Sequence, residues 1–309
     1  MKLIGLILQI FFALQQTNAQ LPTVTKGSIV RHTQFASAYV PPRNVDVWLP
    51  PNYSPATKYA VLYMSDGQML YDTATTWNHQ AWNMAEAVME LQATYPIKNV
   101  IIVGVWNGGS DRHREYFPQA VYELLTKAEQ DTITTQLISK GRTTTAFKPN
   151  SNNYLKFMVT ELKPFIDKTY STLPNAANTY IMGSSMGGLI AMYAICQYPK
   201  VFGGAACMST HWPGIFQTTH NPIPNAMLLY LQRHLPNPKN HKLYFDCGDQ
   251  TLDSLYPPIQ HRVDAVMQAK AFTHNNWLTN YVVGANHSEK AWASRVHIPL
   301  LFLLKLNKI

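Results

Sequence analysis

The chain has 309 residues, and its 25 Lys and Arg against 17 Asp and Glu give a formal net charge of +8. Hydrophobic residues make up 46% and charged residues 14%, which excludes a disordered chain and a charged coiled coil. The basic residues are scattered singly and form no recognisable nucleic-acid module, so we expect no nucleic-acid partner. Three cysteines in apolar stretches are too few for a disulfide framework.

The first residues differ from the rest of the chain. Lys2 gives a positive start, and the run Leu3–Leu14 is apolar except for Gln9. This run is shorter than the roughly twenty apolar residues of a membrane anchor. We therefore expect residues 1–19 to be a signal peptide cleaved after Ala19, and residues 20–309 to form one domain. The mature protein is expected to be secreted or periplasmic, without a stable membrane anchor.

Strand-like and helix-like segments then alternate through the chain. Short apolar or β-branched runs predict strands at Val45–Leu49, Tyr59–Met64, Asn99–Val105, Thr179–Met182, Phe202–Met208, Lys242–Cys247 and Leu278–Val283. Helical spacing predicts helices at Asn78–Leu91, Tyr154–Tyr170, Met186–Tyr198, Pro257–Ala271 and Ser288–Leu304. This alternation predicts a mostly parallel central sheet with helices on both faces. The polar stretch 123–153 breaks the rhythm, and we expect an insertion or lid there, with a purely structural excursion as the alternative.

The strand at Thr179–Met182 runs into Gly183-Ser184-Ser185-Met186-Gly187 and then directly into a helix. This Gly-x-Ser-x-Gly pattern is typical of a sharp turn that exposes a serine hydroxyl, and crowding in the turn requires small neighbours. We therefore predict that Ser185 is a nucleophile and that Ser184 is a bystander. The amide of Met186, among the first free donors of the helix, is expected to bind an oxyanion.

A serine nucleophile needs a base and an orienting acid, which follow it along such a chain in the order acid, then histidine. His287 lies on a glycine-containing loop after the last predicted strand, and it is the expected base. Asp249 and Asp253 both lie on the loop after the preceding strand, and on spacing alone either could orient the imidazole. Asp246 lies inside that strand and is expected to be structural.

A second oxyanion donor is expected from the loop after an earlier strand. Asp66-Gly67-Gln68 follows the strand Tyr59–Met64, and its glycine lets the backbone approach a substrate, so we nominate the amide of Gln68. An ordinary turn accounts for Asp-Gly equally well. Arg112 and Glu115 are expected to form a structural pair that supports this loop.

His211 and Trp212 follow the strand Phe202–Met208 and are expected to line the substrate pocket, with simple packing as the alternative. The chain contains neither a His-Glu-x-x-His run nor a cysteine pair at metal spacing. We therefore expect no catalytic metal and no cofactor.

These features together resemble the putative esterase family of α/β hydrolases, which includes feruloyl and acetylxylan esterases, siderophore esterases, esterase D and the mycolyltransferases. The shared motifs span about residues 40–305 and are Tyr63–Gln68, Arg112–Pro118, Gly183–Gly188, Tyr198–Gly204 and Gly284–Trp292. The resemblance implies an α/β-hydrolase fold.

Position by position, the resemblance makes Ser185 the nucleophile and His287 the base, and it favours Asp253 as the acid. It also supports the amides of Gln68 and Met186 as oxyanion donors. Many relatives carry a small hydroxyl residue where this chain carries a second carboxylate on the same loop.

The resemblance implies a secreted serine carboxylesterase that hydrolyses acyl esters, of feruloyl or acetyl type, on carbohydrate through an acyl-enzyme. The expected partner is a small-molecule or carbohydrate ester. Three alternatives stay open: an acyltransferase to sugar hydroxyls, a siderophore esterase, and a non-catalytic carbohydrate-binding homologue.

Overall fold

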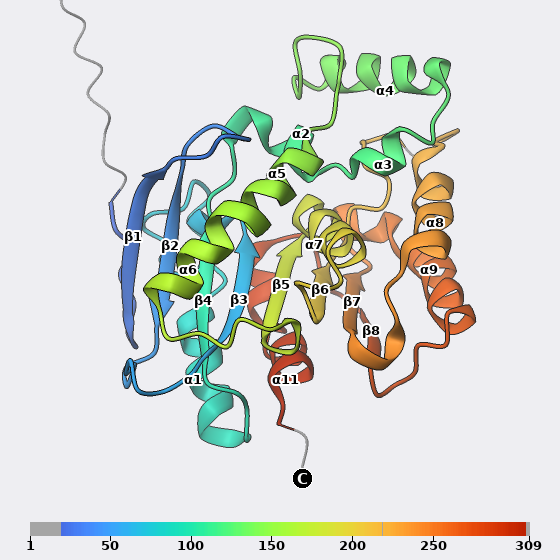
Figure 1. The fold of residues 1–309 in the computed structure, drawn as a ribbon. Helices are drawn as coiled ribbons and strands as arrows, with labels where there is room; N and C mark the ends of the chain where they lie inside the picture. The colour runs from blue at the N-terminus through green and yellow to red at the C-terminus, as the bar shows by residue number, and fades with distance from the viewer. Residues whose placement is uncertain (1–19, 218, 307–309) are drawn as a thin grey trace, which may run out of the picture.

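The computed structural model describes residues 20–217 and 219–306 (Figure 1). The expected signal peptide over residues 1–19 lies outside the described residues, so cleavage after Ala19 stays a prediction. Within the described residues, no helix combines the length and the apolar character needed to cross a membrane.

The described strands form one sheet in the order β1-β2-β4-β3-β5-β6-β7-β8. They are β1 Ser28–Phe35, β2 Arg43–Leu49, β3 Ala60–Ser65, β4 Val100–Val105, β5 Thr179–Ser184, β6 Gly204–Met208, β7 Lys242–Gly248 and β8 Trp277–Val282. β2 is antiparallel to both β1 and β4, whereas the pairs from β4 through β8 are parallel. The predicted fold class is confirmed: this is the mostly parallel central sheet of the α/β-hydrolase fold.

Helices cover both faces of the sheet (Figure 1). One face carries α1 Met84–Thr94 and α11 His297–Leu304, and the other carries α5 Ser151–Phe157, α6 Lys163–Thr169, α7 Met186–Gln197, α8 Ile223–His234 and α9 Pro257–Ala269. Along β3, Val61 and Tyr63 join the core under α7, whereas Leu62 and Met64 join the core under α1. Because both faces are buried, the inner strands read as continuous apolar runs.

Three further helices, α2 Arg112–Tyr116, α3 Gln119–Tyr122 and α4 Lys127–Ser139, lie beyond the carboxyl ends of the parallel strands (Figure 1). The stretch 123–153 therefore contains a regular helix. A capping box opens it, in which the Thr126 side chain accepts from the Glu129 amide and the Glu129 side chain accepts from the Thr126 amide.

Two predicted helices begin or end differently. The helix expected from Asn78 begins only at Met84, because the preceding residues form a loop. The helix expected over Ser288–Leu304 is divided into α10 Glu289–Ala293 and α11. The break lies beside Arg295, whose side chain turns inward to a buried carboxylate.

Candidate active site

Ser185 lies at the sharp turn between β5 and α7, with φ 57° and ψ −122°. A non-glycine residue persists in this strained region only where its surroundings hold it. The Ser185 amide donates to the Met208 carbonyl at 3.0 Å, and the Ser185 carbonyl accepts from the His211 amide at 3.1 Å. A Cβ added at Gly183 would lie 2.6 Å from the Gly187 carbonyl oxygen. The turn is therefore as crowded as its sequence pattern predicts.

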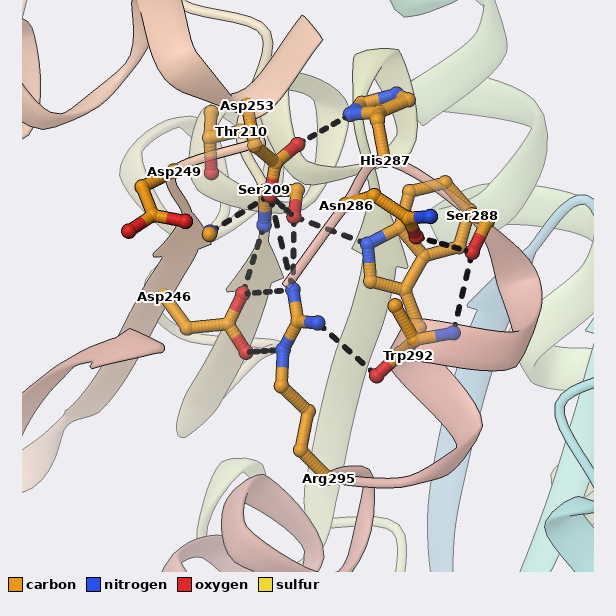
Figure 2. Close-up of polar contacts among 12 residues, drawn as sticks. Ser209, Thr210, Asp246, Asp249, Asp253, Asn286, His287, Ser288, Trp292 and Arg295 are labelled. Carbon is orange, nitrogen blue, oxygen red and sulfur yellow. Dashed lines mark hydrogen bonds and ion pairs between the residues drawn. The ribbon is translucent and has the colours of Figure 1, made fainter. Parts of the chain in front are cut away.

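His287 and Asp253 meet although 34 positions separate them in the chain (Figure 2). The distance from His287 Nδ1 to Asp253 Oδ1 is 2.5 Å, and the Asp253 side chain is fully buried. The other carboxylate oxygen accepts hydrogen bonds from Ser209 Oγ at 2.5 Å and from the Gly248 amide at 2.7 Å. Burial alone would raise the pKa of Asp253, but the hydrogen bonds outweigh it and hold this pKa below its ordinary value. An ionised carboxylate thus orients the imidazole.

Asp249, the alternative candidate for the acid, does not contact the imidazole of His287. Its Oδ1 accepts from the Gly284 amide at 2.8 Å, and its own amide donates to the Ala285 carbonyl at 3.2 Å. Asp249 therefore fixes the loop that carries His287, while Asp253 contacts the ring itself.

A buried polar network lies beneath Asp253 (Figure 2). Arg295 Nε lies 3.0 Å from Asp246 Oδ2, and both side chains are almost fully buried. Ser209 Oγ accepts from Arg295 at 2.9 Å and from the Trp292 indole at 2.9 Å, and it donates to Asp253. Asp246 is structural, as expected, and its partner in this network was not predicted. A buried ion pair needs such additional hydrogen bonds to offset the loss of hydration.

The two expected oxyanion donors lie on two different elements. Gln68 is on a 3₁₀ turn, η1 Gly67–Met69, and Met186 is the first residue of α7, so its amide precedes the first intrahelical hydrogen bond. Both residues line the same cavity as Ser185. A Cβ at Gly67 would lie 2.4 Å from the Gly104 carbonyl carbon, so glycine lets the turn lie against β4.

The expected pairing of Arg112 with Glu115 is wrong. Arg112 binds Asp66 through two hydrogen bonds of 2.7 Å each, whereas Glu115 binds Arg43 at 2.6 and 2.8 Å. The buried carboxylate of Glu115 pairs with Arg43 in β2, and local spacing does not reveal this partner. Arg112 nevertheless holds the loop that carries Gln68, because Asp66 begins that turn.

A cavity of about 770 Å³ connects these groups. Ser185, His287, Gln68 and Met186 line it together. The stretch 123–153 reaches it through Arg142, whose guanidinium lies 5.4 Å from the centroid of the Phe216 ring. This stretch therefore forms part of the cavity wall. Within residues 20–217 and 219–306, no group of three or more His, Cys, Asp or Glu side chains could hold a metal ion.

The two residues expected to line the pocket after β6 have different positions. His211 is buried and borders the cavity. Trp212 belongs to the core instead, so its expected place in the pocket is wrong. Its indole donates to Gln260 in α9 at 2.9 Å and its ring packs against Phe245 in β7, which gives this large side chain both burial and a polar partner.

Tyr256 is a site residue that sequence reasoning missed, and no local motif marks it. Its hydroxyl lies 2.8 Å from His211 Nδ1, and its ring packs edge-on against His287 with centroids 5.8 Å apart. Burial raises the pKa of Tyr256 well above its ordinary value, while a hydrogen bond with Ser185 acts in the opposite direction. A neutral phenol therefore lies against His211 and His287.

Buried histidines make the fold sensitive to acid. Burial, followed by nearby positive charge, lowers the pKa of His211 to about 3 and that of His113 to about 4. In the unfolded chain each imidazole takes up a proton near pH 6.5, so between these values the unfolded state binds more protons and stability falls as the pH falls. At pH 5, each of these two histidines should lower the free energy of unfolding by about 2 kcal/mol relative to pH 8.

Urea unfolding at pH 8 and pH 5 tests this expectation. His211→Gln should reduce the difference in unfolding free energy between the two pH values by about 2 kcal/mol. His274→Gln changes an exposed histidine and should follow the wild type. Equal pH dependence of His211→Gln and the wild type would contradict the buried, neutral state of His211.

Comparison with known proteins places the chain in a family. The family model described as putative esterase matches residues 38–298, so the chain belongs to the putative esterase family. Uncharacterized protein YjcH of Bacillus subtilis (strain 168) is 25% identical over 166 residues, which are 53% of this chain and 54% of that protein. The chain thus spans about half the length of this curated relative.

Solved structures share the fold. A ferulic acid esterase superposes with a TM-score of 0.63 at 18% identity, covering 90% of this chain and 98% of that one. An IroE-like serine hydrolase from Shewanella oneidensis superposes with a TM-score of 0.59 at 18% identity, covering 88% of this chain and 78% of that one.

Proposed function

We propose that the protein is a secreted serine carboxylesterase that hydrolyses acyl esters on carbohydrate. The observation that carries the proposal is the contact of His287 with the buried Asp253 at the cavity that also contains Ser185. Membership of the putative esterase family supports ester hydrolysis. The fold shared with a ferulic acid esterase supports an aromatic acyl ester as substrate, and the aromatic content of 12% supports stacking on a ring of the acyl group or of a sugar.

In the proposed reaction, Ser185 Oγ attacks the ester carbonyl carbon while His287 Nε2 takes the hydroxyl proton. The amides of Gln68 and Met186 stabilise the negative oxygen that forms. The bond to the alcohol then breaks, and His287 returns the proton to the leaving oxygen. Water, activated by the same imidazole, releases the acid and restores the serine.

Throughout this cycle, Asp253 stabilises the charged imidazole that exists after each proton transfer. The lowered pKa of Asp253 supports this role, because the carboxylate stays ionised at the pH values where His287 must be neutral to accept a proton.

An ester panel tests the function. Purified protein is assayed with acetyl, butyryl and feruloyl esters of xylo-oligosaccharides and with enterobactin as a siderophore ester. We expect hydrolysis of at least one sugar ester and no acylated product when free oligosaccharide is added. We also expect the N-terminal sequence of the secreted protein to begin at Gln20. Cleavage of enterobactin alone would contradict the substrate class, and acyl transfer to the oligosaccharide would contradict hydrolysis.

A further inference from the structure

One wall of the cavity carries a tryptophan that is largely exposed to solvent. Trp77 lies on the loop between η1 and α1, borders the cavity, and is 81% exposed. By contrast, Trp82 on the same loop is 3% exposed and stacks on Trp292 with centroids 5.4 Å apart. The core is therefore completed without Trp77. Ligand cavities are commonly lined by aromatic side chains, and this indole at the border of the cavity is accessible to a ligand.

The loop around Trp77 is held in place by α10. Asn78 Nδ2 donates to Glu289 Oε2 at 2.8 Å, and the Lys290 amide donates to Gln80 Oε1 at 3.1 Å. These two contacts lie one and three residues after Trp77 and join segments that are 211 and 210 positions apart. The ring is thus presented by an anchored segment, which lowers the entropy that a ligand would have to remove.

The position of His287 in the reaction determines which part of an ester substrate would contact this wall. In ester hydrolysis, His287 protonates the leaving oxygen, so the alcohol part of the ester must lie beside His287. Glu289 follows His287 by two residues and borders the cavity, and its side chain holds the loop of Trp77. The wall formed by this loop and α10 is therefore on the alcohol side of the scissile bond.

The wall offers the groups that a sugar ring needs. An indole face packs against the C–H face of a pyranose, while amide and carboxylate groups bind its hydroxyls. The hydrogen bonds formed among the described residues use Oε1 of Gln80 and Oε2 of Glu289. The Gln80 amino group and Glu289 Oε1 are thus left for a ligand. The side chains of Trp77, Gln80 and Glu289 all border the cavity.

We propose that Trp77, Gln80 and Glu289 form a subsite for the sugar ring at the alcohol side of the ester. This inference rests on the proposed function, because His287 defines the alcohol side. The subsite would set the preference for esters of oligosaccharides over esters of small alcohols.

Kinetics with two acetyl esters test the subsite. For each variant we compare kcat/KM for acetylated xylotetraose with kcat/KM for 4-nitrophenyl acetate, which lacks a sugar. Trp77→Ala should lower the ratio of these two values about tenfold, as expected from losing one aromatic contact surface, and Trp77→Phe should restore part of it. Tyr95→Ala removes another exposed aromatic residue, which follows α1 outside the cavity, and should keep the wild-type ratio. An unchanged ratio in Trp77→Ala would overturn the proposal.

Binding gives a readout that is independent of turnover. Xylotetraose, cellotetraose and mannotetraose are titrated into the Ser185→Ala variant in an isothermal titration calorimeter. At least one tetraose should give a binding isotherm, and adding Trp77→Ala should weaken the measured affinity about tenfold. No response to any tetraose, or equal affinity in the double variant, would overturn the subsite. Failure of the proposed function would look different, because the wild type would then hydrolyse none of the sugar esters, whether or not a tetraose binds.

Discussion

Ser185→Ala is expected to lower kcat for ester hydrolysis by about 10⁵-fold or more, because it removes the atom that attacks the carbonyl. Alanine fits the turn without new contacts, and it requires the same positive φ of 57° that serine already adopts. The variant should therefore fold normally, which circular dichroism and urea unfolding would verify. Initial rates on the best substrate of the ester panel provide the measurement.

Ser184→Ala is the matched control, since it makes the same change one residue earlier, at the end of β5. It should keep its activity within about tenfold of the wild type, because this hydroxyl has no proposed role. If Ser184→Ala loses activity while Ser185→Ala retains it, the nucleophile has been placed at the wrong residue.

Asp253→Asn is expected to lower kcat by about 10⁴-fold. The substitution replaces a charged acceptor 2.5 Å from His287 Nδ1 with an amide, which cannot stabilise the charged imidazole and favours the wrong tautomer. KM should change far less than kcat, because Asp253 is fully buried beneath the ring and does not border the cavity.

Asp249→Asn provides the matched control for the acid. The oxygen of asparagine can still accept from the Gly284 amide, so the loop of His287 should stay in place and kcat should remain within about tenfold. The opposite pattern, a large loss in Asp249→Asn and a small loss in Asp253→Asn, would show that the acid has been misassigned.

The inner part of the fold was predictable because its strands are buried on both faces. The runs at β3 through β7 are apolar and bounded by turns, which is the pattern that periodicity detects. β1 was missed because Ser28–Phe35 lies at the sheet edge, contains no fully buried residue and is largely polar. α8 was also missed, and it begins at Ile223-Pro224 directly after Pro222, where proline masks the helical signal.

The site was predictable where its signal is local. Ser185 is marked by the glycines of its turn, and His287 by its place on a loop after the last parallel strand. The residues that hold them are distant in sequence: Arg295 reaches Asp246 across 49 positions and Ser209 across 86. Spacing carries no information on such contacts, since they depend on how helices fold back onto the sheet.

The same limit explains the two wrong expectations. Arg112 and Glu115 are three residues apart on a helix, a spacing that favours a contact, but Arg112 binds Asp66 on the loop after β3 and Glu115 binds Arg43 on β2 instead. Trp212 follows a strand that ends near the cavity, yet its ring packs in the core beside α9. In both cases tertiary packing overrides the local pattern.

Covalent labelling tests the central claim most directly. Diisopropyl fluorophosphate reacts with a serine that an adjacent base activates, and peptide mass spectrometry identifies the modified residue. The account predicts one diisopropylphosphoryl group on Ser185 of the wild type, and no label on Ser185→Ala. A label on a different residue, or equal labelling of the alanine variant, would contradict it.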